Sequence, residues 1–166
     1  MHPKSGSPAL FAAVLTALLL SAPVRAEQNL TDSIETIRAL YQADRQTTVA
    51  ETLELTDAES PRFWPLYRAY RTEMEKLGDE LVKLVLEYAD VYPYVPQDRA
   101  ETMLTEYTAL EVKMAKTRAG YVKRAGKVIP AAKALRWAQI ENRLDIALRL
   151  QLASAIPLAP APKPTE

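Results

Sequence analysis

The sequence contains no cysteine and a single histidine, His2. Without cysteine, the chain has no thiol for lipid attachment, no disulfide and no thiol chemistry. Zinc, copper and nickel prefer imidazole or thiolate ligands, so a metal site would have to be built from carboxylates, which suit hard cations better. The di-metal pattern of helical bundles, which needs Glu-x-x-His on two helices, is missing as well. We therefore expect no metal and no other cofactor.

Catalytic motifs are also missing. The chain has no glycine-rich phosphate-binding loop, and only Ser33, Ser60 and Ser154 remain after residue 26 as serine nucleophiles. Each is more simply a helix cap or a surface residue. Close carboxylate pairs are expected by chance among the 18 acidic residues of 27–111. We predict that the protein is not an enzyme.

The first 26 residues have the pattern of a secretory signal peptide. Lys4 precedes an apolar run at 9–20, and the segment ends in Val24-Arg25-Ala26. The run is too short for a comfortable membrane span. We predict cleavage after Ala26, a periplasmic location and no integral membrane span after cleavage. His2 would be removed with the signal.

The remaining chain is long enough for one domain with its own core, which we place at 27–156, followed by a proline-rich disordered tail at 157–166. Its charge is segregated. Residues 27–111 carry 8 Lys or Arg and 18 Asp or Glu, a net charge of −10, whereas residues 112–149 carry 10 and 2, a net charge of +8. The two parts can neutralise each other across an antiparallel hairpin or across a dimer. Nucleic acid is not an expected partner, because the basic part lacks the interleaved aromatic residues of an obvious binding motif and the chain is expected to be exported.

Residues 57–92 have the pattern of one long amphipathic helix. Thr56 and Glu59 form a capping-box pattern at its start, although Pro61 would also suit the first turn of a helix that begins later. Such a helix is about 50 Å long, whereas a compact globule of this size spans roughly 35 to 40 Å. We therefore expect an extended hairpin or a homodimer. The apolar seam has steps of four and three residues: Phe63, Tyr67, Tyr70, Met74, Leu77, Leu81, Leu84, Tyr88 and Val91.

Three further helices are expected, at 31–52, 98–127 and 130–155. Adjacent threonines at 47 and 48 should weaken the first of them. Asp98 is the expected cap of the third helix. If this helix runs antiparallel to the long one, Gly120 comes opposite Tyr70. The expected fold class is all-α, an elongated four-helix hairpin or cradle with one long central helix.

The stretches Leu55-Thr56-Asp57-Ala58-Glu59 and Phe63-Trp64-Pro65-Leu66-Tyr67 resemble the Spy/CpxP superfamily of periplasmic proteins. That family has an LTxxQ motif at the start of a long helix, and here Glu59 stands in place of the glutamine. A degenerate second motif is Ile129-Pro130-Ala131-Ala132-Lys133, followed by Arg136, Gln139, Ile140 and Glu141. The chain is most similar to a proteobacterial branch with FWPxY and QIE stretches. The resemblance implies a thin helical cradle, formed as an antiparallel dimer, that holds unfolding proteins without ATP or senses envelope stress.

We therefore predict a chaperone-like protein or stress-response adaptor that binds unfolded or flexible polypeptides. Apolar side chains of the motif, bordered by basic residues, would hold a client loosely, and long-range charge would speed its capture. The alternative is a structural or signalling partner of one dedicated envelope protein. A broad patch of exposed aromatic residues would favour the first function, and a compact one the second.

The candidate interaction residues are Leu55, Thr56, Glu59, Phe63, Trp64, Pro65, Tyr67, Tyr70, Arg118, Lys123, Arg124, Lys127, Pro130, Gln139 and Glu141. A simpler interpretation gives Leu55 and Thr56 the roles of hydrophobic staple and cap, and places Trp64, Tyr67 and Tyr70 in the bundle core.

Overall fold

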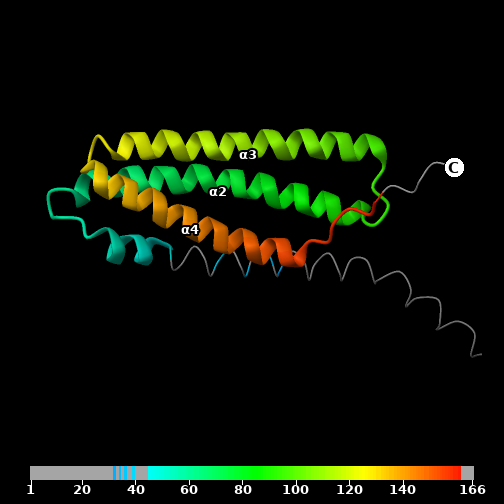
Figure 1. The fold of residues 1–166 in the computed structure, drawn as a ribbon, viewed down its shortest axis with the longest axis horizontal. Helices are drawn as coiled ribbons and strands as arrows, with labels where there is room; N and C mark the ends of the chain where they lie inside the picture. Colours follow the sequence, from blue (N-terminus) through cyan, green and yellow to red (C-terminus); the bar gives the residue numbers. More distant parts are fainter. Residues whose placement is uncertain (1–31, 33, 35, 37–38, 40–44, 162–166) are drawn as a thin grey trace, which may run out of the picture.

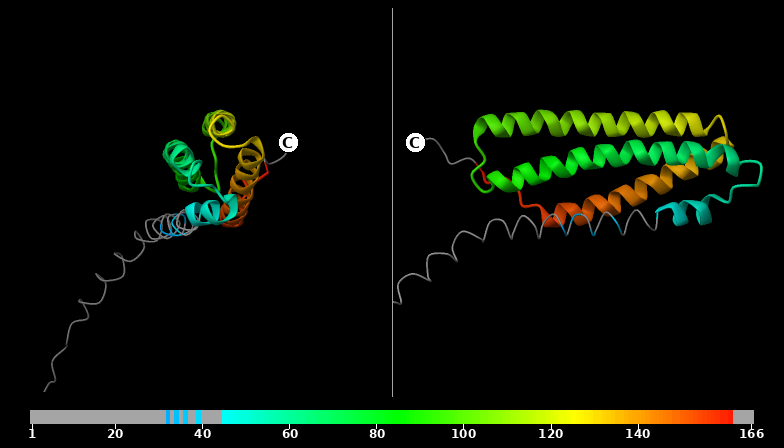
Figure 2. Two further views of the ribbon diagram at one scale, coloured as in Figure 1. Left: turned by 90° about the vertical axis from the view of Figure 1, so that its left-hand side faces the viewer. Right: turned by 180° about the vertical axis from the view of Figure 1, so that it is seen from behind.

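The computed structural model describes residues 32, 34, 36, 39 and 45–161, and this part of the chain contains helices and no strand. The predicted all-α fold is confirmed. A helix at 45–53 is followed by α2 (Ser60–Val91), α3 (Gln97–Ala125) and α4 (Ala131–Ala155). Figure 1 shows these three helices lying lengthwise in an elongated bundle, and Figure 2 shows the 45–53 helix on the side opposite α3. The expected signal peptide lies outside the described residues.

No helix within the described part of the chain is long and apolar enough to cross a membrane.

The long helix α2 begins at Ser60 and not at residue 57. The Thr56 carbonyl accepts hydrogen bonds from the amides of Glu59 and Ser60, both at 3.0 Å, and so closes a turn before the helix. Pro61 then lies in the first turn, where a missing amide costs no intrahelical hydrogen bond. The later start that Pro61 suggested is therefore correct, and Pro65 lies inside the helix.

The ends of α3 also differ from the predicted ones. Pro96 occupies the N-cap position, and Asp98 lies in the first turn, with no side-chain hydrogen bond capping the helix. Capping by Asp98 was therefore a wrong prediction, although its charge still faces the positive end of the helix dipole. The helix ends at Ala125 and not at 127, because the amides of residues 127–129 turn back to the carbonyls of Arg124 and Ala125.

The predicted weak stretch at 47 and 48 does not interrupt the first helix, which is continuous over 45–53. Val49 and Leu53, on the same helix, are fully buried, and this burial outweighs the low helix propensity of two threonines. At the other end of the chain, α4 stops at Ala155, and residues 157–161 form no helix.

The core is centred on Trp137, at the end of the bundle where α2 and α4 begin. Its ring lies 5.4 Å from that of Phe63 and 5.2 Å from that of Tyr70. Tyr121 of α3 adds a ring 5.4 Å from Tyr70. Gly120 does not face Tyr70: it is exposed, and a Cβ placed on it would have no heavy atom within 4 Å. The predicted register was wrong by one residue, and Tyr121 occupies the position assigned to Gly120.

Candidate interaction surface and buried ion network

The first motif joins the start of α2 to the start of α4. The Glu59 carboxylate accepts a hydrogen bond from the Thr56 amide at 2.8 Å and one from Lys133 Nζ at 2.7 Å. Lys133 also donates to the carbonyl of Glu54 at 2.6 Å, and Glu54 itself has a φ of 49°. The hydrogen bond from Lys133, followed by that from Thr56, lowers the pKa of Glu59. The motif thus forms one of the two hydrogen bonds of a capping box and links the start of α2 to α4.

The aromatic residues of the second stretch lie mostly inside the molecule. Phe63, Tyr67 and Tyr70 are buried in the core. Trp64 is half-buried and packs edge-on against Phe63, with ring centres 5.4 Å apart, while Leu55 packs on the core and Pro65 is exposed. The interpretation that placed Trp64, Tyr67 and Tyr70 in the bundle core is correct for the two tyrosines, which a client cannot reach in this structure, and Trp64 packs against that core while half-buried.

The basic residues that were predicted to border the apolar site have different roles. The Arg118 guanidinium hydrogen-bonds Asp145, and the Arg124 guanidinium stacks 3.5 Å above the Tyr121 ring. Lys123 and Lys127 are exposed. Two further predicted residues are also exposed, Pro130 at the N-cap of α4 and Gln139 on α4. Glu141 is fully buried.

Glu141 belongs to a buried ion network that joins the helices. Arg45, from the 45–53 helix, donates to Glu141 at 2.6 Å and to Asp145 at 2.9 Å. Arg118 of α3 donates to Asp145, Arg71 of α2 lies 3.9 Å from Glu141, and the Trp137 indole donates to Glu141 at 3.3 Å. Two carboxylates of α4, one turn apart, therefore form ion pairs with arginines from three other helices.

The electrostatics of the network favour its charged form. Burial lowers the pKa of Arg45, but the charges of Glu141 and Asp145 outweigh this effect and raise it overall. Burial raises the pKa of Tyr70, and the same two carboxylates raise it further, against the opposing effect of Arg118. Among the described residues, the Tyr70 hydroxyl has no hydrogen-bond partner. The tyrosine therefore stays neutral while the surrounding carboxylates and arginines are paired.

Two residues of the ion network, Arg118 and Glu141, were predicted from the sequence as interaction residues. The other three, Arg45, Arg71 and Asp145, were not predicted. A signal for the carboxylates was present, because Glu141 and Asp145 share the apolar face of α4 that carries Trp137 and Leu148. No comparable signal exists for Arg45, which precedes a stretch of polar residues.

A cleft opens beside the network, and most of its wall is apolar. It has a volume of about 90 Å³ and includes Met74, Leu81, Met114 and Leu148 beside the network residues Arg45 and Asp145. Among the described residues, no three His, Cys, Asp or Glu side chains are grouped so that they could hold a metal ion.

The outer face of α4 carries an exposed stripe that the sequence analysis did not identify. Leu135, Ile146 and Leu150 are 60%, 58% and 68% exposed. Gln139 and Asn142 are also exposed and lie between them. Steps of four and three residues place all five on one side of the helix. We call these five residues the α4 stripe.

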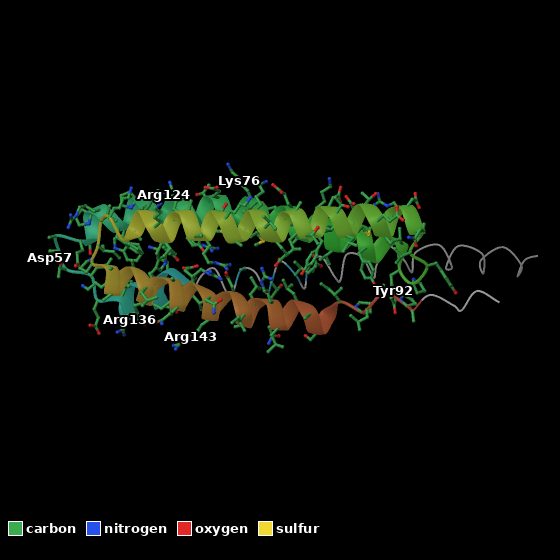
Figure 3. All side chains as sticks on the ribbon, turned by 45° about the horizontal axis from the view of Figure 1, so that its top comes forward. Asp57, Lys76, Tyr92, Arg124, Arg136 and Arg143 are labelled. Atoms are coloured by element: carbon green, nitrogen blue, oxygen red, sulfur yellow. The ribbon has the colours of Figure 1, made fainter. Side chains whose placement is uncertain are left out.

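Arginines flank this stripe on one side. Figure 3 shows Arg136 and Arg143 on the side of α4 that faces away from α3. A shallow groove between Thr52 and α4 is lined by Leu135, Gln139 and both arginines. The only two acidic residues of α4, Glu141 and Asp145, turn inward to the network. The exposed face of α4 is thus apolar, amide-bearing and basic.

The exposed aromatic residues lie elsewhere, at the α2–α3 turn and, in the case of Tyr107, on α3. Tyr92 and Tyr94 are exposed at the turn, and the Tyr88 hydroxyl donates to the Pro157 carbonyl at 3.0 Å. One surface patch of aromatic residues is therefore not formed by Trp64, Tyr67, Tyr70, Tyr88, Tyr92 and Tyr94, because Tyr67 and Tyr70 are buried in the first half of α2, away from the α2–α3 turn.

Comparison with known proteins gives no match: no family model, no curated protein and no solved structure matches this chain.

Proposed function

We propose that this chain is an exported, non-catalytic protein of the periplasm that binds partly unfolded or flexible polypeptides, as a chaperone-like protein or a stress adaptor. The observation that supports this proposal is the α4 stripe. Three aliphatic side chains more than half exposed on one helix face are available to bind apolar segments without unfolding the core. The proposed apolar contact therefore lies on α4, and not at the buried rings of Phe63, Tyr67 and Tyr70.

Exposed basic residues at the end of α3 and just after it support the capture step. Lys123 and Lys127 are exposed, and within the described residues no ion pair neutralises them. Their field attracts acidic segments over about a Debye length, roughly 10 Å at 0.1 M salt. Reversal of both charges should slow client capture at low salt and have little effect at high salt. Arg124 is left unchanged in this variant because its stacking on Tyr121 stabilises the fold.

The test is suppression of aggregation. The processed chain, purified after export, is mixed with a chemically unfolded, unrelated client during dilution from denaturant, and light scattering is followed. The variant Ile146→Ser/Leu150→Ser should lose most of the suppression. The matched variant Leu104→Ser/Val112→Ser changes two exposed residues of α3 and should retain it. If the native protein never suppresses aggregation, the proposal fails.

A second candidate function is docking to one dedicated envelope protein. The compactness of the α4 stripe favours it, since the other exposed large apolar residues lie on α3, at the α2–α3 turn and, in the case of Leu158, beyond the end of α4. This function would be supported if the native chain does not suppress aggregation but binds one envelope protein, and if the Ile146→Ser/Leu150→Ser variant no longer binds that protein.

The homodimer also stays a proposal. Lys113 pairs with Glu80 at 3.1 Å and Arg149 with Glu111 at 2.9 Å, so part of the charge segregation is neutralised within one chain. Support for a dimer therefore comes mainly from the elongated shape of the bundle and less from charge. Sedimentation at micromolar concentration in low salt tests it, and a monomer under these conditions would contradict it.

A further inference from the structure

We propose that the α4 stripe binds an amphipathic α-helix with acidic residues along one flank. This inference rests on the proposed function, because it names the kind of polypeptide that the same surface selects. It is narrower than that function, since a holder of unfolded chains needs no helical partner.

The spacing of the stripe fits a helix. Its residues, from Leu135 to Leu150, follow one another at steps of four and three along a length of about 22 Å. Another helix packs its side chains into this repeat along its whole length, whereas an extended strand with a period of two does not match it. A helix-in-groove contact uses the same arrangement of anchors at i, i+3, i+4 and i+7.

The middle of the stripe is polar, which gives selectivity. Gln139 and Asn142 separate Leu135 from Ile146. A purely apolar segment would leave their amides without hydrogen-bond partners on burial, which is unfavourable. A partner with a polar residue at that layer satisfies them, in the same way that a buried asparagine sets register in coiled coils.

The charge of the flank identifies the partner as acidic. Arg136 and Arg143 are seven residues apart and so lie about 10 Å from each other along one edge of the stripe. Both are exposed, and no described residue forms an ion pair with either. Carboxylates seven residues apart on a second helix would face the two guanidinium groups, which bind carboxylates in a planar, two-bond geometry.

The same charge disfavours other occupants. A second copy that packs α4 against α4 would bring arginines together with no exposed acid on either helix. A membrane surface is a poorer fit because the stripe contains no aromatic residue and no lysine. The concave groove beside Thr52 also fits a protruding side chain better than a flat lipid surface.

The test uses synthetic peptides and calorimetry at 150 mM salt. The first peptide is an amphipathic helix with a leucine seam, one central asparagine and glutamates seven residues apart along one flank. The second has lysine in place of every glutamate, and the third has the composition of the first in an order without helical period. We expect the glutamate helix to bind, and the lysine and scrambled peptides to bind at least about tenfold more weakly.

Protein variants locate the contact. Arg136→Glu/Arg143→Glu should weaken binding of the glutamate helix by about tenfold or more. The control variant Arg68→Glu/Lys76→Glu also reverses two exposed charges, eight residues apart on α2, and should change the dissociation constant less than about twofold because distant charges are screened at this salt. If the arginine reversal unfolds the chain, as judged by circular dichroism, Arg136→Gln/Arg143→Gln replaces it.

Each remaining outcome has a defined meaning. Equal binding of the scrambled peptide overturns the inference and leaves the proposed function intact, provided that aggregation is still suppressed. Equal weakening by the α2 control overturns the assignment to α4. Binding to phosphatidylglycerol vesicles without peptide binding, or loss of a homodimer in Ile146→Ser/Leu150→Ser, shows that the stripe has a different occupant and also overturns the inference. Absence of both peptide binding and suppression contradicts both proposals.

Discussion

Arg45→Met should be among the most destabilising single substitutions in the chain. The Arg45 side chain is 3% exposed and lies 2.6 Å from Glu141, which is 1% exposed. After the substitution, the nearest cation to Glu141 is Arg71, at 3.9 Å. Opposite charges about 4 Å apart interact by about 4 kcal/mol at an effective dielectric constant of 20. Loss of one partner of a buried pair costs about 3 to 5 kcal/mol because the other charge stays buried, and Arg71, which is farther away and 16% exposed, offsets only part of this cost.

The measurement is urea unfolding followed by circular dichroism at pH 7, with a double variant and a control. Arg45→Met/Glu141→Gln removes both charges, keeps an acceptor for the Trp137 indole and leaves Asp145 with Arg118. It should recover most of the lost free energy of unfolding. Arg149→Met makes the same substitution in an exposed pair with Glu111 and should cost less than about 1 kcal/mol. A cost for Arg45→Met as small as that of the control, or a double variant no more stable than the single one, would refute the reasoning.

Three further predictions concern pH and processing. Burial raises the pKa of Tyr67 and Tyr70 above the usual range, so these rings stay neutral in the folded chain, whereas unfolded tyrosine ionises at about pH 10. The free energy of unfolding should therefore fall as pH rises above that value. Urea titrations at pH 9 to 11 would check this. Glu59 has a lowered pKa in the folded chain. Its contribution to stability is therefore present above the unfolded pKa of about 4.3 and is lost as pH falls through the lower folded pKa. The difference in the free energy of unfolding between the native chain and Glu59→Gln should shrink on acidification from pH 6 to 3. Cleavage after Ala26 predicts an exported protein that begins at Glu27, and an intact mass that retains the first 26 residues would contradict it.

Periodicity predicted the helices because each helix of this bundle buries one side. The seam from Phe63 to Leu77 is buried as its spacing indicates, and burial of this side outweighs local irregularities such as the paired threonines. Boundaries were less accurate, since they depend on individual hydrogen bonds. The Thr56 carbonyl delays the start of α2, and the turn at 126–129 ends α3 early.

Contacts between helices were not predictable to the same degree. A register error of one residue moves a side chain by about 100° around the helix, which is why Gly120 was assigned the place of Tyr121. Arg45 gave no sign of burial, because its environment is created by residues about a hundred positions away in α4. The α4 stripe was hidden for another reason: Gln139 and Asn142 interrupt its apolar residues, so it looks in sequence like an ordinary solvated face.

The network and the α4 stripe depend on each other through the charge of α4. This helix has two acidic residues, and the network requires both of them inside the bundle, where they neutralise arginines of the other helices. As a result, no carboxylate of α4 is left to balance Arg136 and Arg143 on its outer face. A rotation of α4 that exposed Glu141 would break the buried pairs and weaken the basic flank at the same time. The arrangement that stabilises the bundle therefore also gives the exposed face of α4 a charge that selects acidic partners.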